Sequence, residues 1–176
     1  AFNTEKLEWL NQHYMRELPA SEVADQLALQ FDRLGIDPSA GPPLADLVTV
    51  QADRVKTLKE MAEQSRVFYS DYEGFDETAA KKNLRTVAEA PLSAVSAKLA
   101  ALPDWTVEAL DAAVRETAAE LEVGMGKIAQ PLRVALTGTA ISPSIDKTLW
   151  LVGRERSLER IGRAIAFVQA RAAAAG

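Results

Sequence analysis

Apolar residues recur every three or four positions along nearly the whole chain, which is the spacing of one face of an α-helix. Val23, Leu27 and Phe31 show this spacing in one segment, and Leu110 and Val114 show it in another. Alanine is common and runs of β-branched residues are rare, a composition that favours helix over strand. Because no segment sustains the alternation of a strand, and no internal repeat is present, the pattern predicts an all-α fold.

Residues that start or stop helices divide this pattern into segments. Pro19 and Gly35 are placed to end the first two helices, and Asp76 and Thr106 are placed to cap later ones. Pro131 falls inside a helical segment, where its missing backbone N–H predicts a kink. The expected helices cover about residues 4–18, 20–34, 43–56, 58–68, 76–84, 91–102, 107–121, 124–137, 144–152 and 154–172. The break at residues 71–75 predicts a division of the chain into two parts.

The composition is typical of a soluble globular protein, because 48% of the 176 residues are hydrophobic and 26% are charged. The absence of cysteine excludes a disulfide framework, a cysteine-ligated zinc site and a thiol nucleophile, and it fits a reducing compartment. His13 is the one histidine, which excludes a His-rich metal site, and we expect it to be exposed. No stretch approaches 18 consecutive apolar residues, so no membrane-spanning helix is predicted.

The net charge of −5 hides an uneven distribution along the chain. Residues 1–123 carry 12 Lys or Arg and 22 Asp or Glu, whereas residues 124–176 carry 8 and 3. The acidic total argues against non-specific binding of nucleic acid. The basic last third predicts one local face that binds an anion.

No segment carries a recognisable catalytic or metal-binding motif. Residues 124–127 look like the end of a phosphate-binding loop, but Ile128 stands where a Ser or Thr is needed, so a helix start is the preferred interpretation. Glu60 and Glu63 have helical spacing on a polar face, which is typical of a solvated surface rather than of acid–base catalysis. We therefore predict no catalytic residue and no metal site in this chain.

Two segments combine residue types that RNA recognition uses. Residues 54–58 join two helices and include Arg54 and Lys56. Residues 132–156 contain an arginine near a helix end, a loop of Gly, Ser and Pro residues, and an apolar residue behind a proline. A Pro or Ile side chain can lie against a flat base, while a guanidinium donates to base edges or phosphates. From residue types alone, an ordinary helix–loop–helix with solvated arginines remains the preferred interpretation.

Four motifs that follow one another in order resemble bacterial glutamyl-tRNA synthetase, a class I aminoacyl-tRNA synthetase. They are FNxxKLxWLNxxY at 2–14, RVKTL at 54–58, LRVALTG at 132–138 followed by SP at 142–143, and GxERxxxRI at 153–161. The resemblance covers essentially the whole chain and implies the C-terminal anticodon-binding half, with two helical bundles in tandem. It implies that residues 1–40 are the end of a stem-contact region and a helical pair, that 41–74 are a first anticodon-binding bundle packed with 1–40, and that 75–176 are a second.

The resemblance also implies which residues meet the anticodon loop of tRNA(Glu). Arg54 matches the arginine with which the family reads the third anticodon base. Arg133, Ser142, Pro143 and Ile145 match positions that hold the first two bases, with Ile145 in place of a commoner Leu. The whole set of RNA-binding residues that we expect is Arg54, Lys56, Arg133, Thr137, Ser142, Pro143, Ile145, Arg154 and Arg156.

The family's nucleotide-binding signatures, His-Ile-Gly-His-like and Lys-x-Ser-Lys-like, are not in these 176 residues. We therefore expect a C-terminal fragment that keeps tRNA recognition, holds no cofactor and lacks catalysis. The resemblance implies a cytoplasmic parent enzyme that joins glutamate to its tRNA with ATP and Mg²⁺, whose N-terminal catalytic half is missing here. We expect the chain to be monomeric and to have no membrane partner.

Two alternatives stay open. A helical protein–protein interaction module without RNA binding would explain the helices, the alanine content and the acidity, although not the four ordered motifs. Within the family, the parent could also charge tRNA(Gln). Two packing expectations complete the prediction: Trp9, Leu10 and Tyr14 pack near the N-terminus, and Arg171 lies near the frayed end of the last helix.

Overall fold

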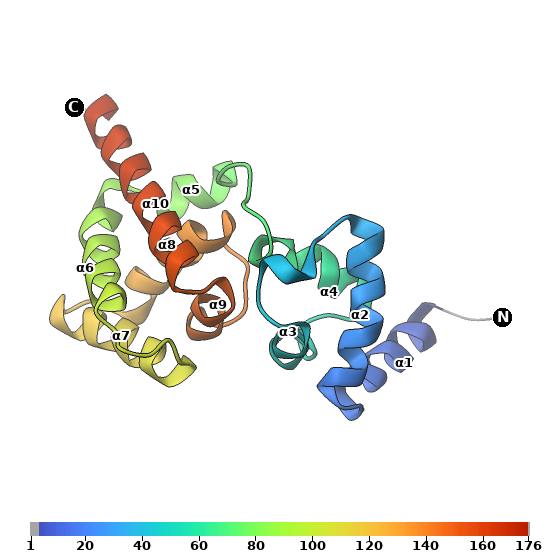
Figure 1. Cartoon of the computed structure of the whole chain (residues 1–176). Coiled ribbons are helices and arrows are strands. Elements are labelled where there is room, and N and C mark those ends of the chain that lie inside the picture. Colours follow the sequence, from blue (N-terminus) through green and yellow to red (C-terminus); the bar gives the residue numbers. More distant parts are fainter. Residues whose placement is uncertain (1–3, 176) are drawn as a thin grey trace. The chain divides into compact units, whose positions relative to one another are not determined.

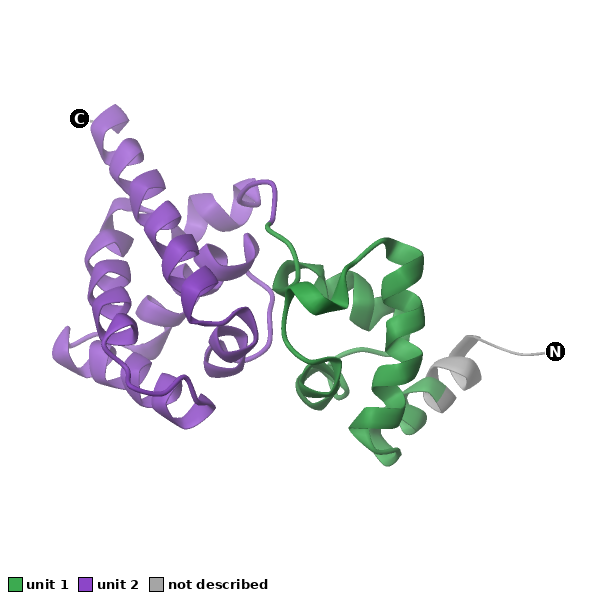
Figure 2. Ribbon diagram, viewed as in Figure 1, with its two compact units in different colours: residues 1–71 green, residues 72–176 purple. Residues whose placement is uncertain are grey.

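The computed structural model describes the backbone of residues 4–175 and the side chains of residues 11–175. Within these residues the chain forms ten α-helices and three short 3-10 helices, with no strand (Figure 1). It divides into two compact units, residues 1–71 and residues 72–176 (Figure 2). The predicted all-α class is confirmed, and the boundary between the units falls within the segment where the helical pattern breaks.

Unit 1 is built around one central helix. It contains α1 (Thr4–Glu17), α2 (Ala20–Leu34), η1 (Pro38–Ala40), α3 (Leu44–Gln51), α4 (Leu58–Ser65) and η2 (Arg66–Phe68). The apolar face of α2, with Val23, Leu27 and Phe31 fully buried, packs against α3 and α4. The ring of Phe31 meets Tyr69 edge-on at 4.9 Å between centroids. The predicted periodicity of α2 therefore marks the core of this unit.

In unit 1 the sequence pattern predicts one helix end correctly and another incorrectly. Gly35 has φ 69°, in the left-handed region, and closes α2 by donating its N–H to carbonyls of the last turn, as predicted. The next helix was predicted too long, because α3 ends at Gln51 rather than near residue 56. The reason is Thr57, which is extended at φ −136° and accepts a hydrogen bond from the N–H of Glu60 as the cap of α4. The chain must leave one helix before this cap can form.

Unit 2 surrounds a central helix with five others. It contains α5 (Glu77–Asn83), η3 (Thr86–Ala88), α6 (Glu89–Ala100), α7 (Val107–Glu120), α8 (Met125–Thr137), α9 (Ile145–Val152) and α10 (Arg154–Ala175). The central helix α8 packs against α5, α6, α7, α9 and α10. Its side chains Ile128, Leu132 and Leu136 are fully buried, so α8 supplies the middle of the core.

The caps predicted for unit 2 are confirmed. Asp76 accepts a hydrogen bond from the N–H of Ala79 at 2.9 Å, and Thr106 accepts one from Ala109 at 3.2 Å. Pro131 lies inside α8 as predicted and is buried there.

The expectation that the last helix is frayed at Arg171 is wrong. Arg171 lies within α10, which runs on to Ala175, and its guanidinium is bonded to carbonyls at the end of α5. In unit 1, Tyr14 is half-buried, while the side chains of Trp9 and Leu10 lie outside the described residues.

Candidate nucleic-acid interface

The loop of residues 138–144, between α8 and α9, starts at a glycine that the backbone requires. Gly138 has φ 79°, a conformation that side chains disfavour, and it closes α8 with its N–H on the carbonyl of Val134. A Cβ at this position would lie 2.9 Å from Cδ2 of Tyr72. Because both the dihedral angle and the lack of space exclude a side chain, the direction in which the loop leaves α8 is fixed.

Two threonine hydroxyls hold the first half of this loop. The hydroxyl of Thr137 lies 2.9 Å from the carbonyl oxygen of Arg133 and 3.1 Å from that of Thr139. The hydroxyl of Thr139 in turn donates to the carbonyl oxygen of Ile141 at 3.1 Å. These local side-chain bonds replace the helical ladder that ended at Gly138, and they order a segment that has no secondary structure of its own.

Arg133 holds the second half of the loop. Its Nε donates to Oγ of Ser142 at 2.8 Å, and its Nη2 donates to the carbonyl oxygen of Pro143 at 3.4 Å. Thr148, on α9, lies beneath the same two residues, with its hydroxyl 3.0 Å from Oγ of Ser142 and 2.9 Å from the carbonyl oxygen of Pro143. The sequence predicted that Arg133, Ser142 and Pro143 act together, and the structure brings them into direct contact.

Exposure separates the residues that hold the loop from those that face solvent. Pro143 is buried, and Thr137 and Ile145 are each 7% exposed. Ile141, by contrast, is 78% exposed at the tip of the loop. Ile145 is the predicted apolar contact, and its RNA-binding role stays a prediction. The sequence analysis did not single out Ile141, although an apolar residue inside a Gly-to-Ser loop is a signal that could have been used. The solvent-facing residues of the loop are Thr139, Ala140, Ile141 and Ser144.

A buried arginine supports the end of α8 from the other side. Arg160, only 2% exposed, donates from Nη1 to the carbonyl oxygen of Leu136 at 2.8 Å and lies 5.5 Å above the ring of Tyr72. The hydroxyl of Tyr72 donates to the carbonyl oxygen of Ala135 at 2.6 Å. Cations and donors are favourable at a helix C-terminus, where carbonyls lack intrahelical partners. Arg160 lay within a quoted motif, but its role was not predicted.

The two arginines at the start of α10 face different surroundings. Arg154 donates from Nη1 to the carbonyl oxygen of Leu99 at 3.3 Å, and its guanidinium lies 5.1 Å from the centroid of the Trp105 ring. Trp105 donates its indole N–H to the carbonyl oxygen of Leu149 at 2.9 Å, so Arg154 belongs to a contact that joins α6, α9 and α10. Arg156 is half-buried on α10. The RNA-binding role of both residues stays a prediction.

The predicted residues of unit 1 lie in the turn between α3 and α4. Arg54 is exposed, and its Nη1 donates to Oε1 of Gln51 at 2.8 Å, while Nε2 of buried Gln51 donates to Oγ of Ser65 at 3.2 Å. Although the residue as a whole is exposed, partial desolvation of its guanidinium lowers the pKa of Arg54 from its ordinary value. The side chain of Lys56 is exposed, and its backbone N–H donates to the carboxylate of Glu60. The turn is therefore held by side-chain hydrogen bonds while its two cations face solvent.

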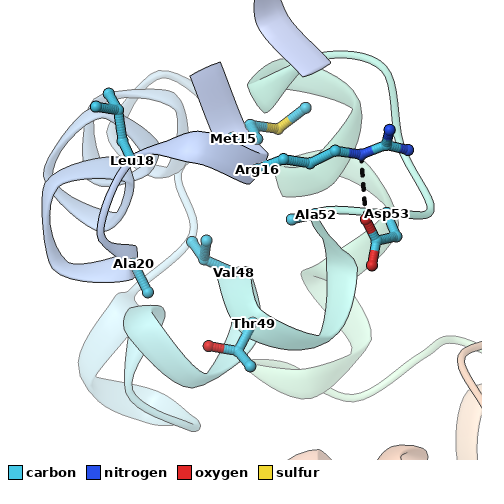
Figure 3. A pocket seen from close by; sticks show the side chains of 8 residues that line it. All are labelled: Met15, Arg16, Leu18, Ala20, Val48, Thr49, Ala52 and Asp53. Atoms are coloured by element: carbon cyan, nitrogen blue, oxygen red, sulfur yellow. Dashed lines mark ion pairs between the residues drawn. The ribbon is translucent and has the colours of Figure 1, made fainter. Parts of the chain in front are cut away.

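Unit 1 also has an open hollow of about 290 Å³ between α1, α2 and α3 (Figure 3). Its two charged lining residues, Arg16 and Asp53, form an ion pair of 3.1 Å, and both side chains are at least half exposed. Its other lining residues are Met15, Leu18, Ala20, Val48, Thr49 and Ala52. Besides this exposed ion pair, the lining offers the hydroxyl of Thr49, which donates to the carbonyl oxygen of Ala45 at 3.0 Å.

Among the residues that the structure describes, no three His, Cys, Asp or Glu side chains are grouped so that they could hold a metal ion. None of the described helices is long and apolar enough to cross a membrane.

Comparison with known proteins assigns the fold. The model of one family, described as an anticodon binding domain, matches residues 8–165. The chain belongs to the anticodon-binding domain family. The anticodon-binding domain that the four motifs imply is therefore confirmed, and the matched range includes the turn of Arg54 and the whole 138–144 loop.

Solved structures of two glutamate tRNA ligases share the fold of this family member. The enzyme from Elizabethkingia meningosepticum, in complex with its amino acid, matches with a TM-score of 0.83 and 22% identity over 95% of this chain and 33% of that one. The enzyme from Elizabethkingia anophelis matches with a TM-score of 0.79 and 23% identity over 94% of this chain and 32% of that one. The chain thus spans about a third of the length of the ligases that it matches.

Proposed function

We propose that this chain recognises the anticodon loop of tRNA(Glu) as part of a glutamate–tRNA ligase. The observation that carries the proposal is the 138–144 loop, where Arg133 is bonded to Ser142 and Pro143 while Ile141 stands exposed at the tip. The family match over residues 8–165 supports RNA as the ligand. It favours this function over a helical protein–protein interaction module.

The arrangement suits single-stranded RNA. Sequence-specific RNA recognition uses unstacked loop bases, which pack against apolar or planar side chains and form hydrogen bonds along their edges. A loop ordered before binding loses less conformational entropy when the RNA arrives. Here the hydroxyls of Thr137 and Thr139 and the guanidinium of Arg133 supply that order. In this proposal the loop tip meets the bases, and Arg133 both positions the loop and adds a positive charge beside it.

The activity of the whole enzyme is part of the same proposal. Both structural matches are ligases of which this chain covers about a third, so the attachment of glutamate to tRNA with ATP would occur in the remainder of the parent chain. We propose that ATP and Mg²⁺ bind there, because the nucleotide-binding signatures are not in these 176 residues. The segment itself would then bind RNA without catalysing, as part of a monomeric cytoplasmic enzyme.

The test is a titration of anticodon stem-loops that differ at one base, followed by fluorescence anisotropy. Arg133→Ala should weaken binding of the tRNA(Glu) stem-loop roughly 5- to 150-fold, the equivalent of losing one base contact of about 1–3 kcal/mol, because the loop tip is no longer held against the bases. Arg54→Gln should instead reduce discrimination at the third anticodon base more than it reduces affinity. Equal affinity for tRNA(Glu) and tRNA(Gln) stem-loops would identify a parent that charges both tRNAs.

Arg33→Gln is the matched control for Arg54→Gln, because Arg33 is an exposed arginine of unit 1 outside the predicted set. It should leave both affinity and discrimination unchanged. The proposed function is wrong if the unaltered chain binds the tRNA(Glu) stem-loop no better than an unrelated hairpin of the same length.

A further inference from the structure

The fold joins two basic stretches that are far apart in the sequence. Residues 78–88 contain Lys81, Lys82 and Arg85 and no acidic residue, although the first 123 residues of the chain are strongly acidic. Residues 160–175 contain three arginines, of which Arg160 is buried, and likewise no acidic residue. In unit 2, η3 packs directly against α10, so the basic stretch around α5 joins the basic last helix. The charge counts for residues 1–123 and 124–176 do not reveal this surface, because its two stretches come from different parts of the sequence.

Specific contacts fix the end of α5 on α10. Nη1 of Arg171 donates to the carbonyl oxygens of Ala80 and Leu84 at 3.0 and 3.1 Å. The ring of Phe167 packs edge-on against Phe75, just before α5, at 5.0 Å between centroids. The guanidinium of Arg171 lies 5.6 Å from the centroid of the same Phe167 ring. These contacts with α10 hold the C-terminal end of α5, and with it the backbone that carries its cations, in one position.

Two other cations of unit 2, on α6 and α7, are neutralised by neighbouring carboxylates, whereas the cations of this stretch are not. Lys98 forms ion pairs with Glu120 and Glu116, at 2.6 and 3.7 Å, and Arg115 forms one with Asp111 at 2.8 Å. Lys81, Lys82 and Arg85 are exposed and form no ion pair among the side chains of residues 11–175.

Two acidic residues border this stretch on α5 and α6. One is Glu77, in the first turn of α5, and the other is Glu89, which accepts a hydrogen bond from Gln169 at 3.0 Å. The segment before α5 adds Glu73 and the capping residue Asp76, so with Arg171 included four cations stand against four carboxylates. Three of these carboxylates lie before α5 or in its first turn, whereas the lysines lie in its last turn and Arg85 follows it, so the positive charge is confined to the C-terminal end of α5.

We infer that Lys81, Lys82 and Arg85 contact the sugar–phosphate backbone of the RNA arm whose loop is bound at residues 138–144. The inference rests on the proposed function and adds to it a second, sequence-independent contact. The N–H of Asp76, which caps α5, donates to the carbonyl oxygen of Gly138 at 2.7 Å, so α5 starts where the loop starts. Its seven residues rise about 10 Å, the axial span of about three phosphates along one strand.

The test measures the salt dependence of binding for Lys81→Gln/Lys82→Gln with the tRNA(Glu) anticodon stem-loop. The slope of log K against log salt is negative, and each phosphate contact that is lost reduces its magnitude by about 0.7–0.9, so the double variant should reduce it by about 1.4–1.8. Extrapolated from 1 M, this corresponds to roughly 25- to 60-fold weaker binding at about 0.1 M salt. The loss should be equal for stem-loops that differ at one anticodon base, because phosphate contacts carry no sequence information.

Three comparisons isolate the effect. Lys81→Arg/Lys82→Arg keeps both charges and should bind like the unaltered chain. Lys127→Gln removes an exposed lysine at the far end of α8, eleven residues before Gly138, and should bind more tightly than Lys82→Gln. Far-UV circular dichroism should show that every variant stays folded, since the substituted side chains are exposed.

The outcomes separate this inference from the proposed function. If the unaltered chain prefers the tRNA(Glu) stem-loop while the double variant shows the same affinity and slope, the surface does not face RNA and the inference is overturned. If instead the unaltered chain shows no such preference, the proposed function fails as well. An unchanged RNA slope, together with lost binding of an acidic protein, would assign the surface to a protein partner and likewise overturn the inference.

Discussion

Two isoleucines at the ends of one short segment should respond oppositely to truncation, because the structure buries one and exposes the other. Ile145, at the start of α9, is 7% exposed, whereas Ile141 is 78% exposed at the loop tip. Truncating a buried Ile to Ala costs about 2–5 kcal/mol, and the small residual exposure of Ile145 places Ile145→Ala near 2–3 kcal/mol. Ile141→Ala should stay within about 0.5 kcal/mol of the unaltered chain.

Urea unfolding measures the free energy of unfolding of each of the two variants. The fluorescence of Trp105 and Trp150 reports on unit 2. The slope of the free energy of unfolding against urea concentration should be unchanged, because neither truncation alters the surface exposed on unfolding by much. A loss near 2.5 kcal/mol should also lower the melting temperature by about 10 °C or more in a unit of this size. Equal destabilisation by the two substitutions would refute the packing that separates the buried base of the loop from its exposed tip.

Two further predictions concern backbone strain and pH. Gly138→Ala should destabilise unit 2 by about 1–3 kcal/mol, because it combines φ 79° with a Cβ only 2.9 Å from Tyr72. Gly126→Ala, in the open first turn of α8, should instead be neutral or stabilise by about 0.5 kcal/mol, and thermal melts of the two variants compare them directly. Burial, and secondarily the charge of Asp46, raise the pKa of the Tyr69 hydroxyl. Stability from this group should therefore be complete below pH about 10 and fall as pH rises further, because the unfolded chain ionises first. Urea titrations should show that Tyr69→Phe removes this part of the alkaline decline, and an unchanged decline would contradict the assignment.

Local signals were sufficient wherever a helix end depends on one residue. Asp76, Thr106 and Gly35 each do what their residue type does in short peptides, so their positions could be read without tertiary structure. The end of α3 could not be read in this way, because the apolar spacing continues to Val55 while the chain has already turned. There, the extended conformation of Thr57 overrides the periodicity.

The sequence indicated which residues form the candidate site, but not how their side chains are oriented. The periodicity and the motifs placed Arg133, Ser142 and Pro143 in one helix-and-loop segment. They did not indicate which side chains of the loop point inward. That choice depends on hydroxyl bonds and on Thr148 from the following helix, which no spacing rule encodes. The role of Arg171 was missed for a related reason, since its acceptors, Ala80 and Leu84, lie some ninety residues earlier in the sequence.

In the 138–144 loop, the side chains that maintain its shape are not the ones that face solvent. Gly138, Ser142 and Pro143 fix the two ends of the loop from inside, while Ala140 and Ile141 form its outer surface. Surface substitutions away from buried contacts usually change stability little. Under the proposed function, recognition at this loop can therefore change by single substitutions at its tip without a compensating change in the core. Residues 140–141 are then the positions to randomise in a selection that tests the proposal through altered RNA preference.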